Sequence, residues 1–157
     1  MTGEPINIHA TTIVIGTTGL MFVGDSGSGK STMAFACLSA ARRNGQFAAL
    51  VADDRTLISQ FGRHVLAEQP SSISGLFELR GSGIASVQHV TASVIHYAVL
   101  PIRSADTQRL PPAGEIYSLP GGGWLPLLRV NVSAPDPLAI LAAFIPELGD
   151  RESARWP

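Results

Sequence analysis

The sequence predicts a single α/β domain in which a mixed β-sheet surrounds one main helix. Short apolar runs rich in β-branched residues recur along the chain and predict the strands. One of these runs, residues 19–23, leads into a glycine-rich loop and then into a helical pattern at residues 32–43. The 157 residues are 45% hydrophobic and 15% charged, which suffices for one domain with a large core. We place this domain at residues 1–148 and a flexible tail at residues 149–157.

The first part of the chain predicts a strand, a tight turn, a second strand and a helix. Residues 6–16 (INIHATTIVIG) predict the first strand, and residues 17–19 turn it back antiparallel to residues 20–23. The helix ends at Gly45, because glycine accommodates the positive φ that commonly closes a helix. Residues 47–52 predict a further strand, parallel to residues 20–23 because a strand, a helix and a strand form a crossover.

The second part of the chain predicts shorter strands and one further helix. The strand patterns lie at residues 56–59, 64–68, 76–80, 92–102 and 124–132, and the first two form a hairpin around a turn at residues 61–63. Pro126 predicts that the last of these lies at the edge of its sheet, since proline cannot donate a ladder hydrogen bond. Asp136 and Pro137 predict the start of a helix that covers residues 138–148.

Composition excludes several classes of protein. The net charge is −1 and there is no basic stripe, which argues against a nucleic-acid partner. The sequence has no apolar run of about 18 residues, so we expect no membrane span. No basic residue precedes Lys30, although a secretory signal peptide begins with a basic region. The single cysteine, Cys37, is expected in the core and fits a reducing compartment, so we expect a cytoplasmic protein.

The loop before the helix has the pattern G-x-x-x-x-G-K-[ST], which is typical of nucleotide-binding proteins. Glycines leave room for backbone amides around phosphate oxygens, and the start of the helix adds further donors. In this pattern Lys30 contacts the β and γ phosphates, and the Ser31 hydroxyl coordinates Mg²⁺. A glycine-rich turn without a ligand is the weaker alternative, given the strand before and the helix after. The predicted nucleotide site, called the glycine loop below, comprises Gly24, Asp25, Ser26, Gly27, Ser28, Gly29, Lys30 and Ser31.

Two acidic residues, Asp53 and Asp54, follow the apolar strand at residues 47–52. A strand that ends in a carboxylate forms the second half of most sites built on such a loop, where the carboxylate holds Mg²⁺ directly or through water. Two adjacent carboxylates allow one to serve the metal while the other acts as a base toward a hydroxyl. The alternative is that one aspartate only caps a turn, and we expect a functional role for at least one of them.

The remaining polar candidates are less specific. Glu78 and Arg80 alternate with apolar residues, which indicates either a solvated edge strand or a second metal ligand beside a phosphate-binding arginine. His9 lies on the first strand, where a lone histidine is usually a satisfied polar residue. Arg103 and Arg109 lie in a proline-rich loop, where an arginine near a phosphate site can stabilise transferring charge, although most loop arginines are simply solvated.

Four separate blocks of the sequence resemble one family. They are residues 9–11 (HAT), the glycine loop, residues 50–55 (LVADDR) and residues 77–84 (FELRGSGI). Their order is similar to that in the C-terminal catalytic domain of HPr kinase/phosphorylase, the bacterial serine kinase that acts on the phosphocarrier protein HPr. The resemblance extends over about residues 6–148 and matches a short form without the N-terminal domain. It implies a P-loop-containing mixed β-sheet domain of the HPr kinase/PEP carboxykinase-like type.

The resemblance also implies a role for each matching position. The implied catalytic residues are His9, Lys30, Asp54 and Arg109. The implied magnesium ligands are Ser31 and Glu78, to which the strand-end pattern adds Asp53. Asp54 would take the proton from the HPr serine, with His9 as its electrostatic partner. Arg80 or Arg109 would offset charge during the transfer.

The function that the resemblance implies is that of an ATP- and Mg²⁺-dependent protein kinase. It would phosphorylate a serine of HPr, regulate carbon metabolism or the phosphotransferase system, and assemble as a homo-hexamer. The family's late P-V-[RK]-P-G-R-N segment, which is tied to dephosphorylation, has no counterpart here. Kinase activity is therefore better supported than phosphorylase activity. Two alternatives stay open: an ATP-binding regulatory or sensor module without phosphotransfer, and a kinase for a small molecule.

Overall fold

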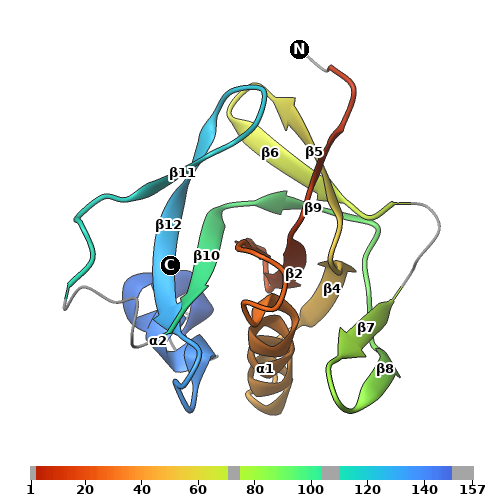
Figure 1. Ribbon diagram of the computed structural model, residues 1–157, viewed down its shortest axis with the longest axis vertical. Coiled ribbons are helices and arrows are strands. Elements are labelled where there is room, and N and C mark those ends of the chain that lie inside the picture. Colours follow the sequence, from red (N-terminus) through yellow and green to blue (C-terminus); the bar gives the residue numbers. More distant parts are fainter. Residues whose placement is uncertain (1–2, 71–74, 104–109, 150–157) are drawn as a thin grey trace.

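The computed structural model describes residues 3–70, 75–103 and 110–149. Within these residues the chain forms strands throughout its length and a long helix after the third strand (Figure 1). The elements are β1 (Ile6–Ile8), β2 (Thr11–Ile15), β3 (Thr18–Phe22), α1 (Lys30–Arg43), β4 (Ala48–Ala52), β5 (Thr56–Phe61), β6 (His64–Glu68), β7 (Leu76–Leu79), β8 (Gly83–Ser86), β9 (Ala92–Ile95), β10 (Tyr97–Ile102), β11 (Ile116–Ser118), β12 (Trp124–Asn131), α2 (Pro137–Phe144) and the 3-10 helix η2 (Pro146–Leu148).

A six-stranded mixed sheet forms the centre of the domain, with the strand order β11-β12-β10-β3-β2-β4. Strands β3, β10 and β12 are parallel to one another, whereas β2 is antiparallel to both of its neighbours, β3 and β4. Strands β3 and β4 therefore run in the same direction, as the strand-helix-strand pattern predicts, with β2 between them. The prediction of a mixed α/β fold is confirmed.

Two smaller sheets complete the structure. The four-stranded sheet has the order β1-β5-β6-β9 and is antiparallel throughout. Strands β7 and β8 form a separate two-stranded sheet, which stands apart from the larger sheets at the lower right of Figure 1. The hairpin that was predicted around Gly62 is confirmed as β5 and β6, and Gly62 has the positive φ of 62° that such a turn favours.

Two segments that the sequence predicts as single strands are each divided between the two larger sheets. Residues 6–16 form β1 and β2, and residues 92–102 form β9 and β10. Strand β1 pairs with β5 whereas β2 pairs with β3 and β4, so the chain crosses between sheets at His9 and Ala10. The second crossing lies at His96. The prediction was wrong here because both halves of each segment are apolar and β-branched, and only tertiary pairing separates them.

The predicted edge position of Pro126 was also wrong, because β11 lies outside β12. Pro126 pairs with Ile116 of β11, and the pairing of β12 with β10 begins one residue later, at Leu127. On the side toward β10, Pro126 is therefore outside the ladder, and its missing N–H leaves no hydrogen bond unmade.

The last predicted helix begins where expected and ends earlier. The Asp136 carboxylate accepts a hydrogen bond from the backbone N–H of Ala139 at 3.1 Å, and Pro137 is the first helical residue. The helix α2 stops at Phe144, and η2 follows from Pro146. Proline in the interior of a helix removes a hydrogen bond and clashes with the preceding turn, so residues 138–148 cannot form one helix.

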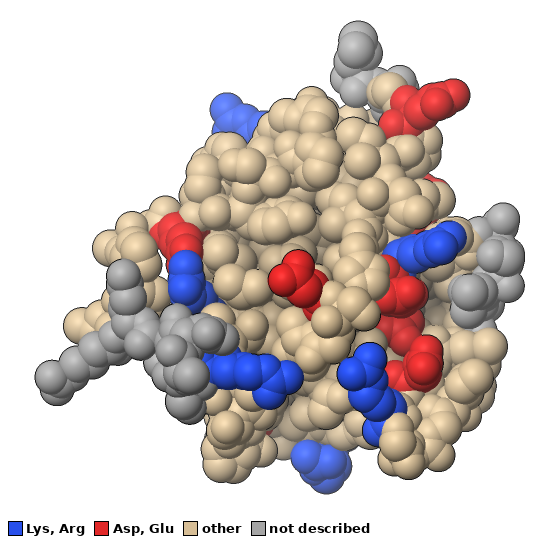
Figure 2. Space-filling model, in the orientation of Figure 1, with Lys and Arg blue, Asp and Glu red and all other residues tan. Residues whose placement is uncertain are grey.

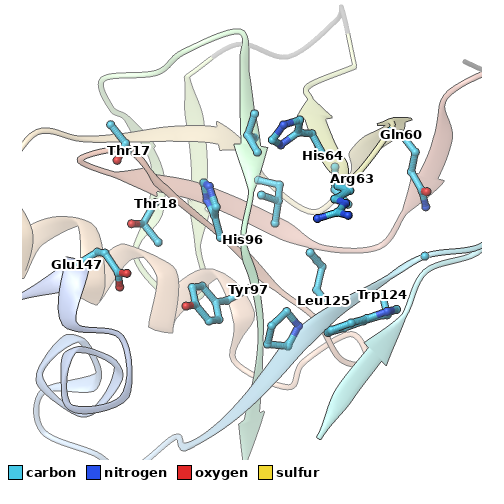
Figure 3. Close-up of a pocket in the computed structure, with 16 residues that line it drawn as sticks. Thr17, Thr18, Gln60, Arg63, His64, His96, Tyr97, Trp124, Leu125 and Glu147 are labelled. Atoms are coloured by element: carbon cyan, nitrogen blue, oxygen red, sulfur yellow. The ribbon is translucent and has the colours of Figure 1, made fainter. Parts of the chain in front are cut away.

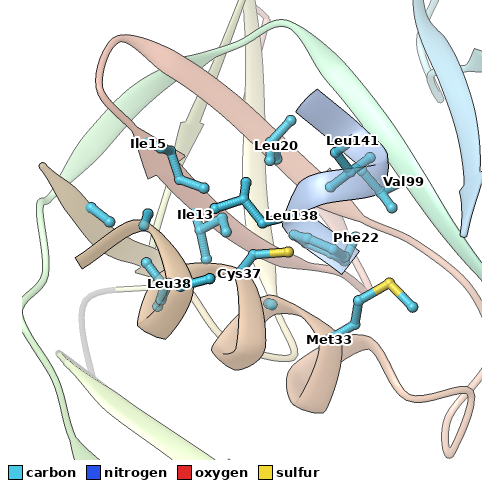
Figure 4. Close-up of a cluster of buried hydrophobic side chains, with 14 of the residues drawn as sticks. Ile13, Ile15, Leu20, Phe22, Met33, Cys37, Leu38, Val99, Leu138 and Leu141 are labelled. Atoms are coloured by element: carbon cyan, nitrogen blue, oxygen red, sulfur yellow. The ribbon is translucent and has the colours of Figure 1, made fainter. Parts of the chain in front are cut away.

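The main hydrophobic core lies between the six-stranded sheet and the two helices (Figure 4). It is built from apolar side chains on the inner faces of these elements, including Ile13, Ile15, Leu20, Phe22, Met33, Cys37, Leu38, Val99, Leu138 and Leu141. Cys37 is fully buried, and burial, followed by the charge of Asp136, raises the pKa of its thiol to about 12. The thiol therefore stays protonated at neutral pH, and the prediction of a core cysteine is confirmed. Among the described residues, no helix has the length and apolar character to cross a membrane.

Candidate functional site

A cavity of about 430 Å³ opens at the carboxyl end of β3, where the glycine loop leads into α1. Its lining comes from the crossing between β1 and β2, the glycine loop, the end of β4, the hairpin β7–β8 and the end of β10. The lining residues are His9, Ser26, Gly27, Gly29, Lys30, Ser31, Thr32, Asp53, Asp54, Glu78, Arg80 and Arg103. Most of the predicted site residues are thus brought together around one space, which we call the loop cavity.

The glycine loop has backbone conformations that residues other than glycine rarely adopt. Gly24, Gly27 and Gly29 have φ values of 132°, 80° and 98°, in the range that favours glycine. Gly29 is the N-cap of α1, and no side chain caps this end of the helix. The first amide groups of a helix have no partner within the helix and carry a partial positive charge, so this end is suited to bind an anion.

Lys30 is buried at the base of the loop, with only 6% of its surface exposed. Its Nζ atom donates hydrogen bonds to the carbonyl oxygens of Gly24 at 2.9 Å and Asp25 at 2.8 Å. Burial lowers the pKa of Lys30, and the negative charges of Asp54, Asp25 and Asp53 act in the opposite direction. The side chain is thus held under the loop by the loop's own backbone.

Asp53 connects three elements around the loop cavity. Its Oδ1 atom accepts hydrogen bonds from the hydroxyl of Ser31 at 2.7 Å and from the hydroxyl of Thr11 at 2.9 Å. Its Oδ2 atom accepts one from the backbone N–H of Glu78 at 3.1 Å. One carboxylate therefore links the start of α1, the strand β2 and the hairpin β7–β8.

The oxygen atoms of Ser31 and Asp53 are a suitable donor set for Mg²⁺. This ion prefers oxygen ligands, keeps several waters, and is usually held by one or two carboxylates together with phosphate oxygens of a substrate. In the described part of the chain, no three His, Cys, Asp or Glu side chains gather closely enough to hold a metal ion by themselves. These oxygen atoms therefore fit a magnesium ion shared with phosphates, and Glu78 on the cavity lining is a further carboxylate nearby.

Asp54 and His9 are in close side-chain contact at the mouth of the loop cavity. The Nδ1 atom of His9 lies 3.1 Å from Oδ1 of Asp54, and the two side chains are 46% and 66% exposed. His9 lies between β1 and β2, and Asp54 lies between β4 and β5. Asp54 has a φ of 68°, the only positive value among the described non-glycine residues, and the left-handed region is sterically unfavourable for most side chains. The carboxylate is therefore open to solvent and held in an unusual backbone conformation.

Two arginines reach the tip of the glycine loop. Nη2 of Arg103 donates a hydrogen bond to the carbonyl oxygen of Gly27 at 3.2 Å. A guanidinium nitrogen of Arg80 lies 3.4 Å from the position that a Cβ atom on Gly27 would occupy. In Figure 2, acidic and basic side chains lie next to one another on the right-hand part of the face shown, whereas most of that face is uncharged. Arg109, the arginine that the sequence favours, lies outside the described residues.

Sequence reasoning weighed Arg103 only as one of two loop arginines and did not count it among the site residues, and it gave Thr11 no role of its own. Arg103 follows β10, and β10 lies parallel beside β3, so both strands end at the same edge of the sheet. Thr11 comes two residues after His9, and side chains two residues apart in extended chain lie on one face. The position of Arg103 at the site could be predicted only by knowing that β10 neighbours β3, which the sequence does not reveal.

A larger cavity, of about 650 Å³, lies at the opposite end of β3 (Figure 3). Its lining includes Arg63, His64, His96, Trp124 and Glu147. Its described lining includes neither a glycine-rich helix start nor a pair of adjacent carboxylates. The residues that the sequence predicts for the site therefore line the smaller loop cavity, which cavity size alone would not select.

Comparison with known sequences identifies the relatives of this chain. A family model described as HPr Serine kinase C-terminal domain matches residues 2–96. The HPr kinase/phosphorylase of Mycoplasmopsis pulmonis is 29% identical over 87 residues, which are 55% of this chain and 26% of that protein. The HPr kinase/phosphorylase of Levilactobacillus brevis is 34% identical over 88 residues, which are 55% of this chain and 26% of that protein. The chain thus matches about a quarter of the length of these curated relatives.

A solved structure has the same fold. The HPr(Ser) kinase/phosphatase from Coxiella burnetii superimposes with a TM-score of 0.69 and 21% sequence identity. The superposition covers 91% of this chain and 93% of that chain. The similarity in fold therefore continues beyond residue 96, where the match to the family model ends.

Proposed function

Because the chain belongs to the family of HPr serine kinase C-terminal domains, we propose that it is an ATP- and Mg²⁺-dependent protein kinase that phosphorylates a serine of HPr. The observation that carries the proposal is that Lys30, Ser31 and Asp54 all open into one cavity. A phosphate-binding group, a metal-binding group and an exposed base are thereby within reach of one bound nucleotide. The relatives whose names state this activity support the proposal.

Nucleotide binding is assigned to the glycine loop and Lys30. The uncapped start of α1 and the loop glycines would surround phosphate oxygens with backbone amides. The Lys30 ammonium, now bound to the carbonyl oxygens of Gly24 and Asp25, would donate instead to the β and γ phosphates. Burial of Lys30 keeps its charge close to the loop, where it acts with little competition from water.

Metal binding is assigned to Ser31, Asp53 and Glu78. When bound, Mg²⁺ would neutralise charge that develops on the phosphate oxygens. Asp53 holds the Ser31 hydroxyl at 2.7 Å, which fixes the direction of its oxygen before any ligand arrives. Glu78 is tied to the same aspartate through its backbone N–H, so the hairpin β7–β8 supplies the further carboxylate.

Proton transfer is assigned to Asp54. Its carboxylate would take the proton from the serine hydroxyl of HPr as the serine oxygen forms a bond to the γ phosphorus. The bond between this phosphorus and the oxygen that bridges it to the β phosphate breaks, and ADP leaves. His9, whose Nδ1 lies 3.1 Å away, would orient the Asp54 carboxylate and offset its charge.

Charge stabilisation is assigned to Arg80 and Arg103. Both side chains line the loop cavity, and Arg103 already contacts the loop at Gly27. A guanidinium group stabilises charge on a phosphoryl group during transfer. Arg103 thus joins Arg80 in the part that the sequence gave to Arg80 or Arg109.

The proposal is tested by transfer of label from γ-labelled ATP, with Mg²⁺, to HPr from the same source. We expect label on a serine of HPr, and we expect Asp54→Asn to reduce the rate by about 10²- to 10⁴-fold. Asparagine tolerates the left-handed backbone of Asp54, so this variant removes the base with little change in the fold. Glu147→Gln, which removes an acid from the larger cavity, is the matched control and should transfer label at the wild-type rate.

Failure of the transfer would be informative. If ATP binds and no label reaches HPr or any small-molecule acceptor, the kinase proposal is wrong and the domain is an ATP-binding regulatory or sensor module. If label reaches a small molecule instead, the acceptor is wrong and the catalytic assignment stands. A separate reaction with phosphorylated HPr and inorganic phosphate measures the reverse activity, which is less supported.

We also propose a homo-oligomer, a hexamer by resemblance. Large apolar side chains on the surface, such as Ile84 and Phe144 at 71% and 70% exposed, are available to such contacts. Light scattering on the purified protein measures the mass of the assembly directly.

A further inference from the structure

Two adjacent threonines at the start of β2, Thr11 and Thr12, are fully buried. Their hydroxyl groups have different partners, because successive side chains of a strand point to opposite faces. The Thr12 hydroxyl lies 2.9 Å from that of Thr56, which in turn donates to the carbonyl oxygen of Ala10 at 3.0 Å. The Thr11 hydroxyl instead faces the two aspartates of the loop cavity.

The Thr11 hydroxyl contacts both aspartates. It donates a hydrogen bond to Oδ1 of Asp53 at 2.9 Å, and it accepts one from the backbone N–H of Asp54 at 3.4 Å. A hydroxyl has one hydrogen to donate and two lone pairs, so one group can make both bonds at once. Because Thr11 is buried, water does not readily replace either bond when it is lost.

An irregularity between β2 and β4 brings Thr11 to this position. Ile13 pairs with Leu50, but Thr12 pairs with Ala52, so β4 contains one extra residue at this point. The next residue of β2, Thr11, therefore comes level with Asp53 instead of Ala52. Such bulges bend a strand and redirect its side chains, and they are frequent beside active sites.

The backbone of Asp54 also needs support. Its φ of 68° is unfavourable for a residue with a side chain, and such a conformation persists where surrounding contacts fix it. Two hydrogen bonds hold the backbone here: the Thr11 hydroxyl accepts from the N–H of Asp54, and the Arg55 N–H donates to the Asp53 carbonyl oxygen at 2.8 Å. The first of these is the one that a single side chain supplies.

We infer that Thr11 is a positioning residue, whose hydroxyl fixes the carboxylate of Asp53 and the backbone of Asp54 in the arrangement that phosphoryl transfer requires. The inference rests on the proposed function. Thr11 does not line the loop cavity, so it acts through the two aspartates and not on a substrate. Without its hydroxyl, Asp53 loses one of its two Oδ1 partners and Asp54 loses the side-chain acceptor of its N–H.

Three variants separate this role from simple packing. Thr11→Val keeps the size and branching of the side chain and removes the hydroxyl. Thr11→Ser keeps the hydroxyl and removes the methyl group. Thr12→Val removes the neighbouring buried hydroxyl, which binds Thr56 and neither aspartate, and is the matched control for the loss of a buried hydrogen bond.

The first readout uses the protein without nucleotide or metal. Hydrogen–deuterium exchange reports how firmly each backbone N–H is held. In Thr11→Val, we expect the amides of Asp54 and Glu78 to exchange at least about threefold faster, because both depend on the arrangement of the Asp53–Asp54 pair. In Thr12→Val, these two amides should exchange at the wild-type rate.

The second readout is the transfer of label from γ-labelled ATP to HPr. We expect Thr11→Val to lower kcat by about tenfold or more, since the lost bond is made to a charged group. The affinity for ATP measured without Mg²⁺ should stay near the wild-type value, because Lys30 and its hydrogen bonds to Gly24 and Asp25 do not involve Thr11. Thr11→Ser should recover most of kcat.

Specific results would overturn the inference. These are a wild-type kcat in Thr11→Val, a kcat in Thr11→Ser as low as in Thr11→Val, or equal effects of Thr11→Val and Thr12→Val on the two amides. If the wild-type protein transfers no label, the proposed function fails. The exchange experiment then decides alone whether Thr11 fixes the two aspartates.

Discussion

The two ends of β3 use the same backbone in opposite ways. At the start of the strand, the N–H of Gly19 donates to Nδ1 of His96 at 3.0 Å, and its carbonyl oxygen accepts from the backbone N–H of His96 at 2.9 Å. At the other end, the chain turns through the glycine loop to an uncapped helix start. The protein uses its own groups to satisfy the first end and leaves amide groups available at the second. Availability of backbone donors, and not the size of the nearby cavity, distinguishes the two ends.

Loss of the lysine at the carboxyl end should have the largest effect on binding. Lys30→Ala removes the buried positive charge beneath the loop, and we expect the affinity for ATP to fall by about 100-fold or more. Equilibrium binding of a fluorescent ATP analogue measures this directly. Arg63→Ala removes a positive charge from the larger cavity and should change the affinity less than about twofold. Equal losses of ATP affinity in Lys30→Ala and Arg63→Ala would contradict the proposed difference between the two ends of β3.

A methyl group at the start of β3 should affect stability instead of binding. A Cβ atom on Gly19 would lie 2.1 Å from the carbonyl oxygen of Val94, so the backbone at the crossing from β9 to β10 must shift. We expect Gly19→Ala to lower the free energy of unfolding by about 2–3 kcal/mol, measured by urea denaturation. The control is Gly3→Ala, whose added atom has no neighbour within 4 Å. An unchanged unfolding midpoint in Gly19→Ala would contradict the close approach.

The arginine beside the loop tip sharpens the comparison further. Arg103→Gln removes a guanidinium that contacts Gly27, and we expect the transfer rate to fall by about tenfold while the affinity for ATP changes by a few-fold at most. Steady-state kinetics with varied ATP separate these two quantities. Arg63→Gln in the larger cavity is the matched variant and should leave both unchanged. A fall in affinity alone would assign Arg103 to binding and not to charge stabilisation.

The smallest expected effect is on the pH dependence of stability, through His96 beside the start of β3. Burial, and then the nearby His64, lower the pKa of His96 below its usual value of 6.5. Below about pH 6.5 the unfolded chain therefore binds more protons at this residue than the folded protein, and stability falls as pH falls toward the lowered pKa. His96→Asn keeps an acceptor for the Gly19 N–H and cannot titrate. We expect unfolding midpoints measured from pH 7 to pH 5 to fall less steeply in this variant, and an equal slope would exclude the contribution.

The parts of the fold that the sequence predicted are those set by local chemistry. The glycine loop, the helix α1, the turn at Gly62 and the cap at Asp136 each follow from the conformation or hydrogen bond of a few neighbouring residues. The two divided strands were not predictable in this way. Each crossing, at His9 and at His96, depends on which distant strand each half pairs with.

The candidate site likewise contains residues that local sequence predicts and residues that only long-range strand pairing brings to it. Lys30, Ser31 and the two aspartates were expected together, since a loop and a strand end of this type commonly share a site, and they line one cavity. Arg103 and the contacts of Thr11 depend on β10 lying beside β3 and on the bulge between β2 and β4. Long-range pairing of this kind leaves no mark in the local sequence. The chemical roles of these residues stay predictions until the variants are measured.

The contact between His9 and Asp54 lies in the seam between two sheets. On one side of the pair β2 and β4 belong to the six-stranded sheet, and on the other side β1 and β5 belong to the four-stranded sheet. Each residue lies in the short segment where the chain passes from one sheet to the other. The proposed base thus lies where the chain passes between the sheets, outside the ladder of either, so its placement depends on how the two sheets meet.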